Sequence, residues 1–138
     1  MVELLIGQKG SGKTKSLVES VNKASGEVKG NVVFITNTVS RNMYDIKYDV
    51  RMVSAEDFEV KSYEKFCAFI EGIISGNFDI TNIFVDAFFK IVGTSELDGM
   101  EGFLNRVEEL SGKYSVDFVL SLSMDAASAP DYMKKYIK

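Results

Sequence analysis

Apolar residues along the chain follow two alternating patterns, which predict strands and helices in turn. Five short segments are largely apolar or β-branched, as expected for strands that are buried on both faces of a parallel sheet. We predict strands at residues 2–6, 31–36, 49–53, 82–86 and 117–124. Other segments carry apolar residues at helical spacing, and we predict helices at residues 13–24, 62–75, 103–111 and 131–138.

The order of these elements indicates the fold class. Strands that alternate with helices form parallel sheets with right-handed crossovers, so we expect an α/β fold, a three-layer α/β/α sandwich with a mostly parallel five-stranded sheet. Ser25-Gly26 is expected to end the first helix, and Ser95 to Asp98 has the capping-box pattern of a helix start. Without a repeat or a linker, residues 1–138 are interpreted as a single domain.

The amino-acid composition excludes several kinds of catalytic and metal-binding site. The net charge of −4 predicts no general attraction to nucleic acid or to anionic membranes. The sequence has no histidine, which excludes histidine-based acid–base catalysis and histidine-containing zinc sites. Cys67 is the single cysteine, so an intramolecular disulfide is excluded. The first residues do not resemble a signal peptide and no apolar run approaches ~20 residues, so we expect a cytoplasmic protein without a membrane partner.

The most specific motif is a glycine-rich loop between the first predicted strand and the first predicted helix. Residues 7–14 fit the pattern G-x-x-x-x-G-K-[ST] at every fixed position. In such a loop, backbone N–H groups donate to the phosphate oxygens, and the positive end of the helix dipole attracts them. The lysine reaches the β- and γ-phosphates, and the hydroxyl ligates Mg²⁺. We predict a site for ATP with Mg²⁺ that is built from Gly7, Gln8, Lys9, Gly10, Ser11, Gly12, Lys13, Thr14 and Lys15.

An acidic residue on a neighbouring strand is the second element of such a site. Asp86 ends an apolar predicted strand, and with Thr14 it is our predicted metal site, although an Asp there also suits a turn cap. Ala87 follows it, where many ATPases carry a glutamate that orients the attacking water. Glu96 and Asp98, in the predicted loop nearby, are the alternative acids. Nucleotide binding is therefore better supported than hydrolysis.

The remaining candidates for phosphate contacts are individual residues. Ser121 and Ser123 lie near the carboxyl end of the last predicted strand, where ligands bind in open α/β sheets. They are candidate sensors of the γ-phosphate, or equally hydroxyls satisfied within the core. Arg41 and Arg51 are candidates for neutralising phosphate charge, and Lys9 is interpreted as a charge on the lip of the loop.

The loop, Asp86 and the alternation of strands and helices together resemble the P-loop NTPase superfamily over nearly the whole chain, and the layout looks most like its RecA-like branch. Arg41, the strand ending at Asp86 and the segment from Ser121 to Asp125 are similar in order to thymidine kinases. The chain departs from them in lacking the glutamate after Asp86 and the zinc-holding cysteines. The resemblance implies a P-loop NTPase fold and nucleotide binding.

Three functions are compatible with these residues. The first is a small ATP-binding protein that acts as a nucleotide-dependent switch or as a weak, partner-dependent ATPase. The second is a phosphotransferase of the nucleoside kinase type. The third is a RecA-like subunit whose site is completed by a protein partner or by a second copy of the chain. The sequence has no Asn-Lys-x-Asp guanine signature, so ATP is favoured over GTP.

Overall fold

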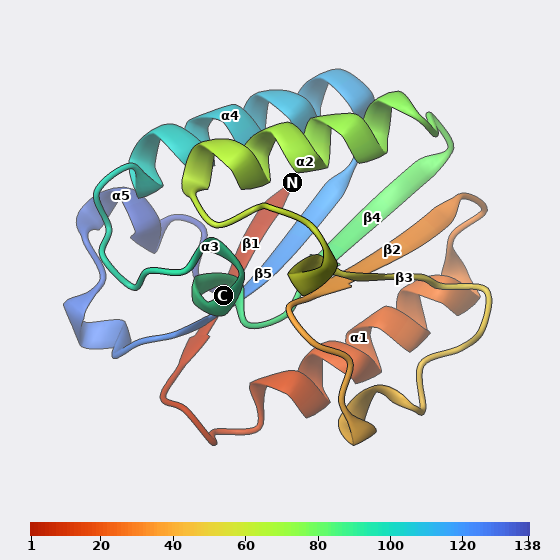
Figure 1. The fold of residues 1–138 in the computed structure, drawn as a ribbon, viewed down its shortest axis with the longest axis horizontal. Helices are drawn as coiled ribbons and strands as arrows, with labels where there is room; N and C mark the ends of the chain where they lie inside the picture. Colours follow the sequence, from red (N-terminus) through yellow and green to blue (C-terminus); the bar gives the residue numbers. More distant parts are fainter.

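A single sheet of five strands forms the middle of the molecule (Figure 1). The structure is a computed structural model, and it describes the backbone of residues 1–138 and every side chain except that of Asn42. The strand order is β1-β5-β4-β2-β3, and each neighbouring pair is parallel. The strands are β1 (Val2–Gly7), β2 (Asn31–Thr36), β3 (Arg51–Ser54), β4 (Ile80–Val85) and β5 (Asp117–Ser123).

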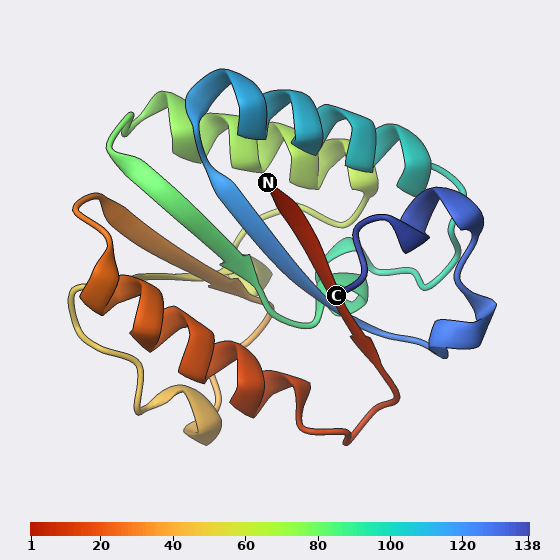
Figure 2. The same ribbon diagram turned by 180° about the vertical axis from the view of Figure 1, so that it is seen from behind.

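Helices cover both faces of this sheet. Figures 1 and 2 show α2 and α4 side by side on one face and α1 alone on the other. The helices are α1 (Lys13–Glu27), α2 (Tyr63–Ser75), α3 (Phe88–Val92), α4 (Met100–Tyr114) and α5 (Asp131–Lys134), and the 3-10 turns are η1 (Arg41–Met43), η2 (Ala55–Asp57) and η3 (Ala126–Ser128). The expected α/β fold with a five-stranded parallel sheet is confirmed. No helix in the described part of the chain is long and apolar enough to span a bilayer.

The core is divided by the sheet into two apolar clusters. On β2, Val33 and Ile35 face the cluster under α2 and α4, while Val32 and Phe34 face the cluster under α1. Side chains of successive strand residues point to opposite faces, so a strand buried on both sides needs apolar residues at consecutive positions. This requirement explains the unbroken apolar run in β2, whose residues from Val32 to Thr36 are all buried.

Two predicted helix boundaries are wrong, one at the C-terminus of α1 and one at the N-terminus of α4. Ser25-Gly26 does not end α1, which continues to Glu27, because the Ser25 hydroxyl donates to the Asp49 carboxylate and so ties the last turn to the β3 side of the fold. The Ser95–Asp98 pattern does not start α4. Its N-cap is Gly99, with a φ of 94° that favours glycine, and the helix begins at Met100.

Two further differences concern short elements. The five-residue helix α3, directly after Asp86, was not predicted, because five residues are too few to show a helical period. The predicted C-terminal helix stops at Lys134, and Ile137 pairs instead with Leu4 of β1. β1 lies at the edge of the sheet, so its free backbone groups accept a new partner. The Leu4 N–H donates to the Tyr136 carbonyl at 2.8 Å.

The strand order places three carboxyl ends next to one another. β5 lies between β1 and β4, with Gly7 paired to Ser123 and Val85 paired to Leu120. The residues that follow β1 and β4 therefore meet beside the end of β5. Ligands bind in this region of open α/β sheets.

Candidate functional site

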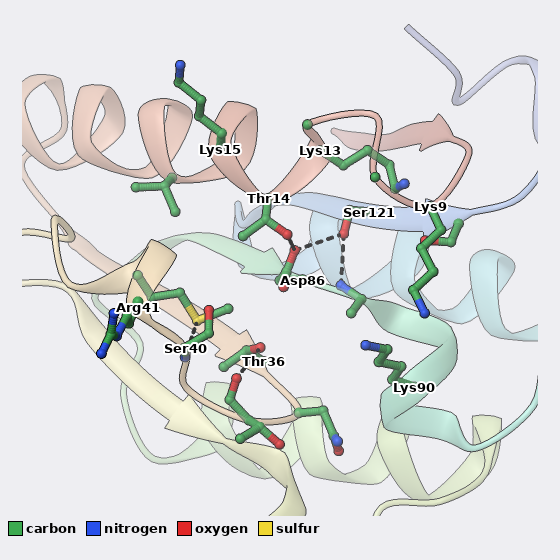
Figure 3. Close-up of a pocket in the computed structure, with 18 of the residues that line it drawn as sticks. Lys9, Lys13, Thr14, Lys15, Thr36, Ser40, Arg41, Asp86, Lys90 and Ser121 are labelled. Atoms are coloured by element: carbon green, nitrogen blue, oxygen red, sulfur yellow. Dashed lines mark hydrogen bonds between the residues drawn. The ribbon is translucent and has the colours of Figure 1, made fainter.

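A cleft of about 980 Å³ lies at the carboxyl edge of the sheet, and Figure 3 shows the side chains that surround it. Its walls come from the loop after β1, the first turns of α1, the segment after β2, the residues after β4 and the end of β5. The lining residues are Lys9, Gly10, Gly12, Lys13, Thr14, Lys15, Val18, Glu19, Asn22, Thr36, Asn37, Thr38, Ser40, Arg41, Met43, Asp45, Asp86, Ala87, Phe89, Lys90, Ser121 and Ser123.

The Asp86 carboxylate is the centre of a hydrogen-bonded cluster in this cleft. Asp86 is only 5% exposed. The Thr14 hydroxyl donates to its Oδ1 at 3.1 Å, and the Ser121 hydroxyl donates to the same oxygen at 3.3 Å (Figure 3). A buried carboxylate needs such donors because burial without a partner costs several kcal/mol. The cluster joins α1, β4 and β5 at one point.

Ala87 makes a sharp turn directly after this carboxylate. Its φ of 53° and ψ of 54° lie in the left-handed region, which costs a non-glycine residue about 1–2 kcal/mol. The Ala87 N–H donates to the Ser121 hydroxyl oxygen at 2.8 Å, so the turn is held by the same serine that contacts Asp86. Strained backbone of this kind clusters at functional sites, and here it directs the chain from β4 into α3.

The loop from Gly7 to Gly12 curls around the ammonium group of Lys13. Gly10 and Gly12 have φ values of 82° and 87°, which are accessible to glycine without strain. The Lys13 Nζ donates to the carbonyl oxygens of Gly7 at 2.9 Å and Gln8 at 2.8 Å. Burial lowers the pKa of Lys13, and the nearby Asp86 carboxylate opposes this shift. The loop thus holds a cation at the start of α1.

The start of α1 is unusual for a helix because neither its N-cap nor its first turn supplies an acidic side chain, and Asp86 of the neighbouring strand end is its negative neighbour. The first N–H groups of a helix have no acceptor within the helix. Here Gly12 is the N-cap and supplies no side-chain acceptor, and the first turn contains no acidic residue. Lys13 and Lys15 both lie in that turn, where the positive end of the helix dipole disfavours cations. An anion in the cleft would stabilise this arrangement.

The structure brings most of the predicted residues together. Lys9, Gly10, Gly12, Lys13, Thr14, Lys15, Asp86, Ser121, Ser123 and Arg41 line the cleft, while Gly7, Gln8 and Ser11 form the loop behind it. Arg51, Glu96, Asp98 and Asp125 are not among its lining residues.

Position within the cleft separates the predicted candidates further. Figure 3 shows the Lys15 ammonium pointing away from Thr14 and Asp86, and the Arg41 guanidinium also pointing away from Asp86. Ser121 is buried against Asp86, whereas Ser123 is exposed at the last position of β5. These contacts distinguish two serines that the sequence left equivalent.

Sequence reasoning did not single out several cleft residues. Thr36 at the end of β2, with Asn37 and Thr38 directly after it, forms one wall, which is fixed because the Thr38 hydroxyl donates to Glu56 at 2.8 Å. A polar run directly after a buried strand is a signal that could have found them. Lys90 of α3 also lines the cleft and was not singled out from the sequence. A single lysine in a short helix carries no such signal.

The cleft does not contain a metal cage made by the protein alone. Within the described part of the chain, no group of three or more Asp, Glu, Cys or His side chains is arranged to hold a metal ion. Thr14 and Asp86 place two oxygen atoms 3.1 Å apart in the cleft, and Mg²⁺ sites commonly take one or two protein oxygens together with phosphate and water.

No protein-family profile matches the chain, and no curated protein shows significant similarity to it. The functional argument therefore rests on the cleft itself.

We expect alanine substitutions at Ser121 and Ser123 to have different effects on the stability of the protein. Ser121→Ala removes a donor to Asp86 and an acceptor of the Ala87 N–H, and we expect it to lower the free energy of unfolding by about 1–3 kcal/mol. Ser123→Ala is the matched control on the same strand, and as an exposed position it should change stability by less than about 0.5 kcal/mol. Denaturant titration of both variants measures this difference. Equal effects would contradict the assigned cluster.

Proposed function

We propose that this chain is a P-loop nucleotide-binding protein that binds ATP with Mg²⁺ in the cleft, as a nucleotide-dependent switch or a weak, partner-dependent ATPase. One observation carries the proposal. The uncapped first turn of α1 holds Lys13 and Lys15 without an acid, and it opens on a cleft in which Thr14 contacts Asp86. A polyphosphate with a divalent cation supplies both missing partners, negative charge for the helix start and further oxygens for the metal.

The charges around the cleft favour the same class of ligand. Its lining includes the five cationic residues Lys9, Lys13, Lys15, Arg41 and Lys90, against the three acids Glu19, Asp45 and Asp86. The chain as a whole carries a net charge of −4, so the cleft is locally positive on a negative protein. Such a field raises the local concentration of an anionic ligand.

Thr14 and Asp86 fit the role of Mg²⁺ ligands. Their oxygens are 3.1 Å apart, and the same carboxylate oxygen also accepts a hydrogen bond from Ser121. Mg²⁺ usually keeps several waters and takes one or two protein oxygens together with substrate phosphates. When bound, the cation would neutralise charge on the phosphates, while the hydroxyl and the carboxylate of this chain orient it.

Weak hydrolysis follows from the residues around Asp86. Ala87 occupies the position after the carboxylate and has no group that accepts a proton. Neither Glu96 nor Asp98 lines the cleft. The Glu96 carbonyl also accepts a hydrogen bond from the Tyr63 hydroxyl at 2.5 Å, which ties that loop to α2. The position after Asp86 therefore offers no base for the attacking water, and the other acids that line the cleft, Glu19 and Asp45, come from α1 and from the segment after η1.

One feature favours phosphoryl transfer to a small acceptor as a second candidate function. The cleft continues from Asp86 along α1 to Ser40, Arg41 and Asp45. Its volume of about 980 Å³ is at the upper end of the range for ligand pockets. Product analysis after incubation with ATP and candidate acceptors distinguishes transfer from hydrolysis.

Lys13→Ala tests the binding site directly. Loss of a charge-assisted contact to phosphate typically costs ~1.5–3 kcal/mol, so we expect roughly ten- to a hundred-fold weaker binding of Mg·ATP. Titration calorimetry is the measurement. Lys23→Ala, an exposed position on α1 outside the cleft, is the matched control and should bind like the wild type. Unchanged affinity in Lys13→Ala would remove the basis of the proposal.

The metal assignment predicts a difference between titrations with and without Mg²⁺. Thr14→Val and Asp86→Asn should lose most of the affinity that Mg²⁺ adds in the wild type, because each removes a ligand oxygen or its charge. In EDTA, Asp86→Asn should bind ATP as well as the wild type or more tightly, since a carboxylate near the phosphates has lost its charge. Equal losses in both buffers would assign these residues to the phosphates and not to the metal.

The isolated protein is expected to hydrolyse ATP well below the ~1–100 s⁻¹ typical of kinases. The physical reason is the missing proton acceptor beside Asp86. Single-turnover assays over a range of protein concentrations measure the rate, and specific activity that rises steeply with concentration would indicate a site completed by a second copy. Fast turnover by dilute protein that Lys13→Ala abolishes would contradict the expectation.

A further inference from the structure

Two lysines line the cleft from elements far apart in the sequence. Lys9 belongs to the loop after β1, and Lys90 belongs to α3 after β4. Both line the cleft, and in the view of Figure 3 the Lys9 side chain extends toward α3, which carries Lys90. The hydrogen bonds of the Lys13 ammonium, in contrast, go to the loop itself.

Neither of these two lysines has a counter-charge. Among the described side chains, Lys9 and Lys90 take part in no ion pair and donate no side-chain hydrogen bond, whereas Lys134, Lys135 and Lys138 each pair with an acid. Like charges that line one cleft repel each other. A negatively charged group between them turns the repulsion into two attractions.

Lys90 is also presented by a fixed backbone. Its helix is anchored by Phe88 and Ile91, both fully buried. The Lys90 N–H donates to the Ala87 carbonyl at 3.0 Å, and the Ala87 N–H is held by Ser121. The strained turn therefore sets the position of the Lys90 backbone relative to Asp86. Only the flexible stem of the side chain remains to adjust to a ligand.

We propose that Lys9 and Lys90 form a second anion subsite of the cleft, and that this subsite takes the terminal phosphoryl group of a nucleoside triphosphate. The inference rests on the proposed function and adds to it a selectivity for triphosphate over diphosphate. The loop and the start of α1 hold the inner phosphates. A terminal phosphate that shares the cation with Thr14 and Asp86 lies on the α3 side of the loop, between the two ammonium groups.

This assignment gives Lys9 and Lys90 the role of neutralising phosphate charge, for which Arg41 and Arg51 were the sequence-based candidates. Arg51 does not line the cleft, and Arg41 points away from Asp86. Lys90 instead lines the cleft and follows Asp86 by four residues. Positive charge on the terminal phosphate also connects nucleotide state to α3, because a diphosphate leaves the two lysines without an anion to contact.

The test compares the affinities of Mg·ATP and Mg·ADP by titration calorimetry. Lys90→Gln and Lys9→Gln should each weaken Mg·ATP binding roughly ten- to a hundred-fold, as for loss of a charge-assisted contact. Binding of Mg·ADP should change by less than about fivefold, the effect of a solvent-exposed charge. Lys90→Arg should keep the preference for ATP, because it keeps the charge. Lys23→Gln, outside the cleft, should alter neither affinity.

The outcomes separate this inference from the proposed function. Equal losses for ATP and ADP in Lys90→Gln and Lys9→Gln would overturn the terminal subsite while leaving nucleotide binding intact. Unchanged binding of both nucleotides in these variants would do the same. A wild-type protein that binds neither nucleotide overturns the proposed function, and the subsite with it. Both lysines are exposed, so circular dichroism should show an unchanged fold, and each variant checks the other.

Discussion

The arrangement of the cleft depends on the contacts of one buried carboxylate. Asp86 accepts hydrogen bonds from Thr14 at the start of α1 and from Ser121 on β5, and its own N–H donates to the Ile35 carbonyl of β2 at 2.8 Å. A buried negative charge is stable only with such partners. Two strands and one helix are thus held together at the edge of the sheet where the loop after β1 begins.

The same contacts connect the carboxylate to the backbone beyond it. Ser121 accepts from Ala87, which keeps that residue in a left-handed conformation and starts α3 at once. Because α3 is anchored by buried aromatic and aliphatic residues, the side chains on its cleft side have a defined origin. Strain in one residue and three hydrogen bonds therefore position both the proposed metal ligands and the proposed contact to the terminal phosphate.

Electrostatics makes the cleft distinct from the rest of the surface. The helix start, the loop and α3 all bring positive charge or N–H groups to one place, although the protein is acidic overall. Such concentration of charge is unfavourable in isolation. It is balanced in part by Asp86, whose proximity opposes the lowering of the Lys13 pKa by burial. An anionic ligand would complete the balance.

The sequence alone determined the elements that have a strong local signal, because the glycine-rich loop, the apolar strands and the helix from Tyr63 to Ser75 are encoded by neighbouring residues. It could not determine the strand order, which depends on contacts between distant segments and places β5 between β1 and β4. It also could not separate Ser121 from Ser123, since residues two apart share one face of a strand. Only the tertiary structure set the first beside Asp86 and the second at the end of the sheet, and only the packing of α3 brought Lys90 to the cleft that Lys9 also lines.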